Sequence, residues 1–290
     1  MTKVRTVALV AKPGSHEALA LAREIRELLA ARRVHVLLEA ALAAALDEPA
    51  GAQPATREET RASDLCVVAG GDGTLIHAVR LLDGAEVPIF GINAGGQLGF
   101  LTEIPRARAL PLLEQALEGG CPVERRIKLA VELTRAGRRL LSAEVFNDVV
   151  INRGALARMV ELRTDIDGVR VTRFRADGVI VATPTGSTAY NLAANGPILL
   201  PTLDAIVVSA ICPHTLTQRP LVLPDRSRVQ FEVLAANGEL LLSLDGQVGE
   251  ALEVGDRVEV RRSEHGVLLV HNPELDFFQI LRSKLGWGER

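Results

Sequence analysis

The 290-residue sequence lacks the motifs that define several common enzyme classes. It contains no Gly-Lys dipeptide, which excludes a phosphate-binding loop of the GxxxxGK[ST] type. The dinucleotide motif GxGxxG also fails, because after Gly71 and Gly73 the third glycine position is Ile76. There is no HExxH, no cysteine or histidine set with zinc spacing, and no GxSxG. The sequence therefore does not support a P-loop enzyme, an ordinary Rossmann fold, a zinc hydrolase or an α/β-hydrolase.

Aromatic residues, cysteines and excess positive charge are also scarce. Aromatics make up 3% of the chain, so the core must consist mainly of Ala, Val, Leu and Ile. Three widely spaced cysteines without a CxxC are typical of a reduced intracellular protein. The net charge of −3 gives no electrostatic footprint for nucleic acid. No apolar run approaches the roughly 18 residues of a membrane span, and the one near the start is too short for a secretory signal. We expect a cytoplasmic protein.

The first 120 residues alternate between strand and helix patterns. Continuous apolar runs, typical of buried parallel strands, occur at residues 6–12, 34–40, 65–70 and 87–93. Helical spacing occurs in residues 15–33, where Ser15 is a good N-cap, and again from about Thr74. Residues 48–60 are polar and contain proline, so we expect a loop there. The pattern predicts an α/β domain with an open, mostly parallel sheet.

After residue 120 the pattern changes to short alternating runs separated by turns. The runs are residues 127–135, 139–151, 159–174, 178–184, 205–211, 228–235, 239–246 and 256–263. Turn sequences such as Asp167-Gly168 and Asn237-Gly238 favour antiparallel β-structure. Residues 274–290 return to helical spacing. We therefore predict three parts: an α/β domain at 1–120, a β-rich domain at 121–271, and a helical segment at 272–290 that packs back on the first domain.

The first candidate site is the sequence GGDGT at the junction between a predicted strand and helix. It comprises Gly70, Gly71, Asp72, Gly73 and Thr74. Glycines let backbone N–H groups approach an anion, and a helix N-terminus favours negative charge, so the stretch suits a phosphate. Asp72 would repel that phosphate. It can instead accept a proton from an attacking hydroxyl, or hold a metal ion that bridges phosphates. The alternative is a tight turn in which Asp72 only caps the helix.

A second glycine-rich stretch, residues 90–103, follows the next predicted strand. Its glycines are Gly91, Gly95, Gly96 and Gly99. Ligands of open α/β sheets lie beyond the carboxyl ends of the strands, so the two glycine loops would line one crevice. The alternative is a mobile loop, which we consider less favoured because Phe100 and Leu101 anchor its end.

Two polar stretches in the second half are further candidates. The sequence TPTGST at residues 183–188 places four hydroxyl groups and a glycine in one turn, directly before Ala189 and Tyr190. Such a turn can bind a sugar or a phosphate while the aromatic ring covers a base, but a purely structural polar turn has the same composition. Asn147 and Asp148 suit a ribose diol, and a plain turn explains them equally well.

Taken in order along the chain, these stretches resemble the NAD kinase family. The matching sequences are GGDGT at 70–74, GINAGGQLGFLTE at 91–103, Asn147-Asp148, ADGVIVATPTGSTAYNLAANGP at 176–197, ICPHTL at 211–216, RPLVLP at 219–224 and Asp245-Gly246-Gln247. GGDGT alone also resembles turns in phosphofructokinases and in diacylglycerol and sphingosine kinases, whereas TPTGSTAY after ADG is far more specific. The resemblance implies an α/β domain and a β-rich domain with NAD between them. It also implies transfer of the terminal phosphoryl group of ATP, or of another donor such as polyphosphate, to the 2′-hydroxyl of the adenosine ribose of NAD, giving NADP.

The resemblance assigns roles to particular residues. Asp72 corresponds to the catalytic aspartate, acting as general base, and Asn147 with Asp148 corresponds to the pair that holds the adenosine part. Many members have Asn-Glu there, so Asp148 is one methylene shorter and its reach to the ribose is reduced. Asp177 is implied on the nicotinamide side, and Arg175 is placed to meet the phosphate of NADP.

The other implied contacts fall into two groups. The adenine and ribose pocket would be lined by Phe100, Thr188, Ala189 and Tyr190. Further expected NAD contacts are Gly73, Ala193, Asp245 and Gln247. The loop for the phosphate donor would be Gly70, Gly71, Gly73 and Thr74.

The resemblance also implies cofactors and partners. Without a P-loop lysine, the charge of the donor must be met by backbone N–H groups and a divalent ion, Mg²⁺ or Mn²⁺, whose ligands the sequence does not identify. We expect a homodimer or homotetramer and no nucleic-acid or membrane partner. A lipid kinase with the same GGDGT turn would need membrane contact, and a non-catalytic NAD(P)-binding regulator would be expected to lack Asp72. The preferred donor and the preference between NAD and NADH stay open.

Overall fold

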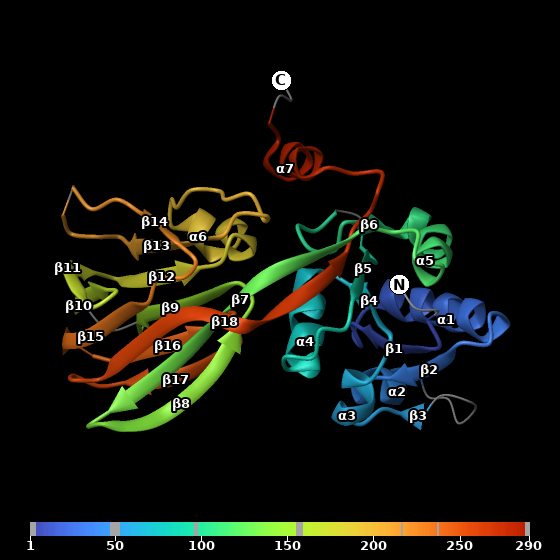
Figure 1. Ribbon diagram of the computed structural model, residues 1–290, viewed down its shortest axis with the longest axis horizontal. Coiled ribbons are helices and arrows are strands. Elements are labelled where there is room, and N and C mark those ends of the chain that lie inside the picture. The colour runs from blue at the N-terminus through green and yellow to red at the C-terminus, as the bar shows by residue number, and fades with distance from the viewer. Residues whose placement is uncertain are drawn as a thin grey trace. The chain divides into compact units, whose positions relative to one another are not determined.

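The structure, a computed structural model, describes residues 4–46, 53–95, 98–154, 159–215, 217–236 and 238–287. The chain divides into two compact units. The first comprises Met1–Arg125 and Gly266–Arg290, and the second comprises Arg126–His265. Figure 1 labels the α-helices and β-strands of both units. Within the described ranges, every helix is too short or too polar to cross a lipid bilayer.

The first unit contains a parallel sheet with strand order β5–β4–β1–β2–β3, and β6 and the end of β18 also pair with β5 in parallel. Its strands are β1 (Thr6–Ala11), β2 (His35–Leu38), β3 (Gln53–Pro54), β4 (Leu65–Gly70), β5 (Ile89–Asn93), β6 (Ile104–Pro105) and the last residues of β18 (Arg257–Val270). Its helices are α1 (His16–Ala31), α2 (Ala40–Leu46), α3 (Arg57–Arg61), α4 (Asp72–Leu82), the 3-10 helix η1 (Arg106–Arg108), α5 (Ala109–Leu117) and α7 (Phe277–Leu285).

Both faces of this sheet are buried, which explains the continuous apolar runs. Along β1, Val7 and Leu9 belong to a core shared with α1, α2 and α5, while Ala8 and Val10, which point to the opposite face, are buried as well. Helix α1 begins as predicted, because the Ser15 side chain accepts a hydrogen bond from the Ala18 N–H at 3.3 Å. The predicted α/β fold is confirmed.

The second unit consists of antiparallel β-structure in two sheets. One follows the order β14–β13–β12–β9–β16–β17; the other contains β11–β10–β15–β18 with β7 on β18 and β8 on β7. The bounds are β7 (Val123–Arg135), β8 (Arg138–Val145), β9 (Asp148–Arg153), β10 (Val160–Ile166), β11 (Val169–Ala176), β12 (Gly178–Ala182), η2 (Thr185–Thr188), α6 (Tyr190–Ala193), β13 (Ala205–Ile211), β14 (Leu221–Pro224), β15 (Val229–Ala236), β16 (Leu240–Leu244) and β17 (Val248–Leu252). Alternate residues of both sheets form one apolar core, as in a sandwich.

The turns of this unit follow the sequence closely. Asp167 and Gly168 join β10 to β11 and both have positive φ, 50° and 78°, as a two-residue hairpin turn requires. The other predicted turn, Asn237-Gly238, includes a residue outside the described ranges. The run at 139–151 is not one strand, because β8 ends at Val145 and β9 begins at Asp148 in the other sheet.

Two further boundaries differ from expectation. Within the expected loop at 48–60, the short strand β3 and the start of α3 are formed, and Thr56 with Glu59 makes a capping box for α3. Helix α4 starts at Asp72 rather than near Thr74, which places Asp72 in the first helical turn. The predicted C-terminal helix is α7, which begins with a second capping box between Asp276 and Gln279 and belongs to the first unit.

Candidate active site

In the first unit, Asp72 connects the two glycine-rich stretches. Strand β4 ends at Gly70, Gly71 is the N-cap of α4, and Asp72 is the first helical residue. A methyl group at Gly99 would lie 1.9 Å from Asp72 Oδ1, so only glycine lets the second stretch approach this carboxylate. The predicted proximity of the two loops is therefore present in the structure, except for Gly96, which lies outside the described residues.

The Asp72 carboxylate accepts four hydrogen bonds from the segment that follows Gly99. Oδ2 accepts from the Phe100 N–H at 2.8 Å. Oδ1 accepts from the N–H groups of Leu101 and Thr102 at 3.1 and 3.0 Å and from the Thr102 hydroxyl at 2.9 Å. Asp72 is thus more than a helix cap, because its side chain fixes the backbone of a distant loop and is itself held in one orientation.

A cavity of about 340 Å³ lies beside the GGDGT turn. Its lining comprises Ala11, Lys12, Pro13, Glu39, Ala41, Gly71, Gly73, Thr74 and His77. The helix N-terminus and the exposed Lys12 make this wall suitable for an anion, and the Glu39 carboxylate of the same lining lies 3.9 Å from His77. Sequence reasoning missed Lys12, although its place directly after a parallel strand, at the edge where ligands bind, was a usable signal.

Phe100 has a second neighbour that the sequence did not indicate. The Lys284 ammonium group of α7 lies 5.8 Å from the centre of the Phe100 ring, within the range of a cation–π contact. The C-terminal helix therefore contributes a positive charge next to the loop that holds Asp72. No local pattern reveals this contact, because 184 residues separate the two side chains along the chain, from 100 to 284.

In the second unit, Asp245 holds the segment that contains Asn147 and Asp148. Its carboxylate accepts hydrogen bonds from the backbone N–H groups of Phe146, Asn147 and Asp148 at 2.7–3.2 Å. Burial raises the pKa of Asp245, while these N–H groups and the positive charge of Lys128 act in the opposite direction. Asp245 was predicted as an NAD contact. The structure gives it a holding role through the backbone.

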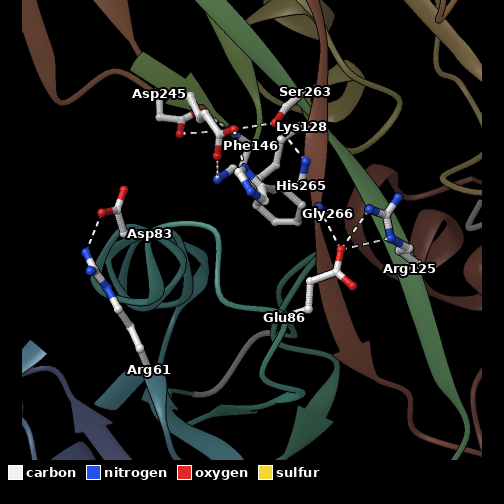
Figure 2. A network of polar contacts seen from close by, with 11 residues as sticks. Arg61, Asp83, Glu86, Arg125, Lys128, Phe146, Asp245, Ser263, His265 and Gly266 are labelled. Carbon is white, nitrogen blue, oxygen red and sulfur yellow. Dashed lines mark hydrogen bonds and ion pairs between the residues drawn. The ribbon is translucent and has the colours of Figure 1, made fainter. Parts of the chain in front are cut away.

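Figure 2 shows the surroundings of this segment in the second unit. The buried Lys128 ammonium group pairs with the Glu144 carboxylate, which also accepts hydrogen bonds from Ser263 and His265. Burial acts to raise the pKa of Glu144, but the hydrogen bonds and charge of these partners outweigh it and lower the pKa to about 2. The network stabilises the strands next to Phe146 and is distinct from the residues predicted to bind NAD.

Asp148 is a buried carboxyl group with a perturbed pKa. It is 4% exposed, and burial followed by the like charge of Asp245 raises its pKa to about 7, although the Tyr190 N–H hydrogen-bonds to it. Within the described ranges, the buried Oδ1 atom of the neighbouring Asn147 has no hydrogen-bond partner. Buried amide oxygens are normally satisfied, so this atom is available to a ligand donor.

Most hydroxyl groups of the TPTGST turn stabilise the turn itself. Thr183 donates to the Phe146 carbonyl at 2.7 Å, Ser187 donates to the Pro184 carbonyl at 2.6 Å, and Thr188 donates to the Thr185 carbonyl at 3.2 Å. A methyl group at Gly186 would lie 2.0 Å from the Asn147 carbonyl oxygen, so the turn packs directly on that segment. The turn was interpreted either as a ligand-binding site or as a purely structural turn. For Thr183, Ser187 and Thr188, these hydrogen bonds favour the structural interpretation.

The predicted residues around this turn differ in accessibility. Tyr190 is 42% exposed and Ala193 is exposed, while Thr188 and Ala189 are half-buried, so this face can meet a ligand. Gln247 is also exposed, in the turn between β16 and β17.

Two predicted charged residues already have protein partners. Asp177 forms a two-pronged ion pair with Arg153, at 2.8 and 3.0 Å. The Arg175 guanidinium lies 3.2 Å from Glu161, which also pairs with Arg173. Any phosphate bound by Arg175 would have to compete with the Glu161 carboxylate.

Comparisons with known proteins agree with these features. The family model described as the ATP-NAD kinase N-terminal domain matches residues 7–121, and that of the ATP-NAD kinase C-terminal domain matches residues 146–272. The NAD kinases of Geobacter sulfurreducens and Geotalea daltonii are 45% and 44% identical to the chain, each covering 99% of it and 100% of the relative.

Two crystal structures are similar over nearly the whole chain. Yeast NADH kinase complexed with NADH has a TM-score of 0.92 and 27% identity, covering 100% of this chain and 90% of that one. An NAD kinase from Archaeoglobus fulgidus in complex with ATP has a TM-score of 0.73 and 27% identity, covering 96% of this chain and 99% of that one.

Proposed function

The chain belongs to the NAD kinase family, and from this premise we propose that Asp72 is the general base in phosphoryl transfer from ATP to the adenosine 2′-hydroxyl of NAD. The observation that carries the proposal is the orientation of the Asp72 carboxylate. Oδ1 is occupied by three donors, whereas Oδ2 accepts one hydrogen bond, from Phe100, among the described residues. Oδ2 therefore has acceptor capacity left for a hydroxyl proton.

The proposed step is an in-line transfer. The 2′-hydroxyl proton passes to Asp72 Oδ2 as the 2′-oxygen forms a bond to the terminal phosphorus of ATP. The bond from that phosphorus to the bridging oxygen breaks, and its electron pair leaves with ADP. An alcohol is a weak nucleophile until its proton has an acceptor, and a positioned base contributes about 10²–10⁴-fold to such a reaction.

The donor phosphates are proposed to bind at the GGDGT turn. Gly71, Gly73 and Thr74 line the cavity at the N-terminus of α4, and Lys12 also lines it. Backbone N–H groups at a helix N-terminus stabilise phosphate, and Lys12 supplies a charge comparable to that of a P-loop lysine. The same site would accept ATP or a polyphosphate chain, because both present terminal phosphoryl groups.

Magnesium fits this arrangement only as an ion held largely by the substrates. The described residues contain no group of three or more His, Cys, Asp or Glu that could hold a metal ion. Mg²⁺ is commonly bound through one or two carboxylates together with substrate phosphates. If Asp72 is not the base, its Oδ2 would instead be the protein ligand of the ion, which would neutralise charge on the donor phosphates.

The acceptor is proposed to bind through the β-rich part, residues 121–271. The unsatisfied Oδ1 of Asn147 and the carboxyl of Asp148 suit the ribose hydroxyls, and Tyr190 is exposed enough to cover a ring. The remaining proposed contacts are Gly73, Phe100, Arg175, Asp177, Thr188, Ala189, Ala193 and Gln247, with Asp245 acting through the backbone that it holds.

Self-association through the β-rich part is a further element of the proposal. Strands β11 and β14 are the edges of their sheets, and both expose apolar side chains. Val169 and Val171 on β11 are 66% and 44% exposed, and Val222 on β14 is 52% exposed. Exposed apolar edge strands tend to be covered by another chain. A homodimer or homotetramer in the cytoplasm would bury them.

The experiment that tests the catalytic role is Asp72→Asn, with the rate of NADP formation from NAD and ATP as the readout. If Asp72 is the base, kcat falls by about 10²–10⁴-fold at saturating Mg²⁺. If Asp72 acts only as a metal ligand, excess Mg²⁺ restores part of the rate. Asp83→Asn is the matched control, because Asp83 caps the opposite end of α4 and, among the described residues, forms its ion pair with Arg61 at the surface. A folded Asp72→Asn protein with close to the wild-type rate would exclude the catalytic role.

A further inference from the structure

The loop that orients Asp72 is held from its other end by a second set of charges. Phe100, Leu101 and Thr102 contact the Asp72 carboxylate, and the Thr102 hydroxyl also accepts a hydrogen bond from the Asn93 side chain at 3.2 Å. The next residue, Glu103, is 8% exposed, and its carboxylate contacts His271 and Asn272, which directly follow β18.

His271 lies between two carboxylates. Its Nδ1 atom is 2.6 Å from Glu103 Oε1, and its Nε2 atom is 2.5 Å from Glu124 Oε2. Ionised carboxylates only accept hydrogen bonds, so both contacts are satisfied when both ring nitrogens carry protons. In that protonation state, the ring bridges the loop before β6 to strand β7. Neutral imidazole, with one N–H, would keep only one of the two bonds.

The backbone around His271 is anchored as well. The His271 N–H donates to the Pro122 carbonyl at 2.9 Å, and the Asn272 N–H donates to Glu103 Oε1 at 3.1 Å. Glu103 therefore accepts hydrogen bonds from a side chain and from the main chain of the same short segment. Immediately after it, Ile104 pairs with Ile92 of β5. Several independent contacts therefore fix the position of Glu103.

We propose that His271 is a positioning residue for phosphoryl transfer, which acts through Glu103 and the Phe100–Thr102 backbone to aim the Asp72 carboxylate. The inference rests on the proposed role of Asp72. Asp72 and His271 hold the same four-residue stretch from its two ends. Without the ion pair at Glu103, the stretch would keep its Asn93 and Asn272 contacts and the pairing of Ile104, but it would lose the charged restraint at its far end. Misplacing a catalytic group by about 1 Å can cost about 10²-fold in rate.

The test is His271→Gln in the full-length enzyme, with kcat and both KM values measured. We expect kcat to fall about tenfold while KM for NAD and for ATP stays within about twofold, because His271 is not among the proposed substrate contacts. His265→Gln is the matched control. His265 also contacts a carboxylate, that of Glu144, but it lies in the second unit, and its hydrogen bonds among the described residues do not involve Asp72 or the Phe100–Glu103 stretch. The kcat of the His265→Gln variant should equal that of the wild type.

A double substitution distinguishes positioning from general destabilisation. If His271 works through Asp72, His271→Gln should change kcat less than about twofold in the Asp72→Asn background, because the group that it aims is gone. An equal fall in kcat in both backgrounds, or a rise in either KM without a fall in kcat, would overturn the inference. It would leave the Asp72 proposal intact, since that depends on Asp72→Asn alone.

Glu124→Gln provides a second variant if His271→Gln does not fold. It keeps the size of the side chain and one acceptor oxygen but removes the charge that favours the imidazolium. We expect kcat to fall about threefold, again only in the presence of Asp72. An unchanged kcat would also overturn the inference.

Discussion

Asp148 makes stability depend on pH in a direction opposite to that of most carboxylates. Burial and the nearby charge of Asp245 raise its pKa from 3.8 to about 7. Below pH 3.8 the Asp148 carboxyl group is protonated in the folded and in the unfolded protein. Between pH 3.8 and 7 the unfolded chain is ionised while the folded protein keeps the proton. The free energy of unfolding therefore falls as the pH rises through this interval, and the whole cost is present above pH 7.

The size of the effect follows from the interval. Each pH unit corresponds to about 1.4 kcal/mol, so ionising Asp148 in the folded protein costs up to about 4 kcal/mol, of which about 3 kcal/mol is lost between pH 5 and pH 8. Asp148→Asn cannot ionise, and its amide oxygen can still accept the Tyr190 N–H. The stability of the variant relative to the wild type should therefore be about 3 kcal/mol greater at pH 8 than at pH 5.

Urea unfolding at pH 5 and pH 8 measures this difference. Glu144, whose pKa is lowered to about 2, titrates below this window and does not interfere. Asp204→Asn is the control, since the Asp204 side chain is 81% exposed and should show no pH-dependent gain. Equal stability differences at both pH values would refute the reasoning. Because Asp148 is also a proposed NAD contact, the stabilised variant should have a higher KM for NAD, an exchange of activity for stability seen at many binding sites.

Two other predictions concern the second unit. Tyr190→Ala should raise KM for NAD about fivefold with little change in kcat, because an aromatic contact contributes about 1 kcal/mol beyond burial; an unchanged KM with a collapsed kcat would place Tyr190 in the chemistry or the fold instead. Light scattering at micromolar concentration should give the mass of a dimer or tetramer, and a stable monomer would exclude an interface on β11 and β14.

The elements of the fold were predictable wherever one physical cause determined a pattern. Burial on both faces gives β1 and β4 their unbroken apolar runs, and the Asp167-Gly168 turn has the positive φ angles that its sequence favours. The start of α4 was misplaced by two residues because glycines weaken the helical signal. The strand break at Phe146 was missed because Phe146, which lies where the chain passes from one sheet to the other, is apolar and so resembles a strand residue.

The candidate site was predictable only in part, because composition does not reveal the partners of a polar group. Thr183 and Ser187 have hydroxyls that suit a sugar, yet both hydroxyls bond to carbonyls of the protein. Lys284 and His271 approach the Asp72 loop from the far end of the chain, and no local spacing marks them. Long-range ion pairs depend on the folded arrangement, so the sequence names the charged residues without pairing them.

The four hydrogen bonds to Asp72 also change what its substitution means. In Asp72→Asn, the amide oxygen can replace Oδ1 and keep the three donors there, but the amide nitrogen then faces the Phe100 N–H, which loses its acceptor. An unsatisfied donor of this kind costs about 1–3 kcal/mol. A fall of 10²–10⁴-fold in kcat corresponds to about 3–5 kcal/mol of transition-state stabilisation, so the two effects overlap in size and must be measured separately. Loop damage lowers the unfolding midpoint and weakens the contacts of Phe100, whereas a missing base lowers kcat in a protein of unchanged KM. The carboxylate between the glycines is therefore explained by two requirements at once, since the loop needs an acceptor for four donors and the alcohol needs an acceptor for its proton.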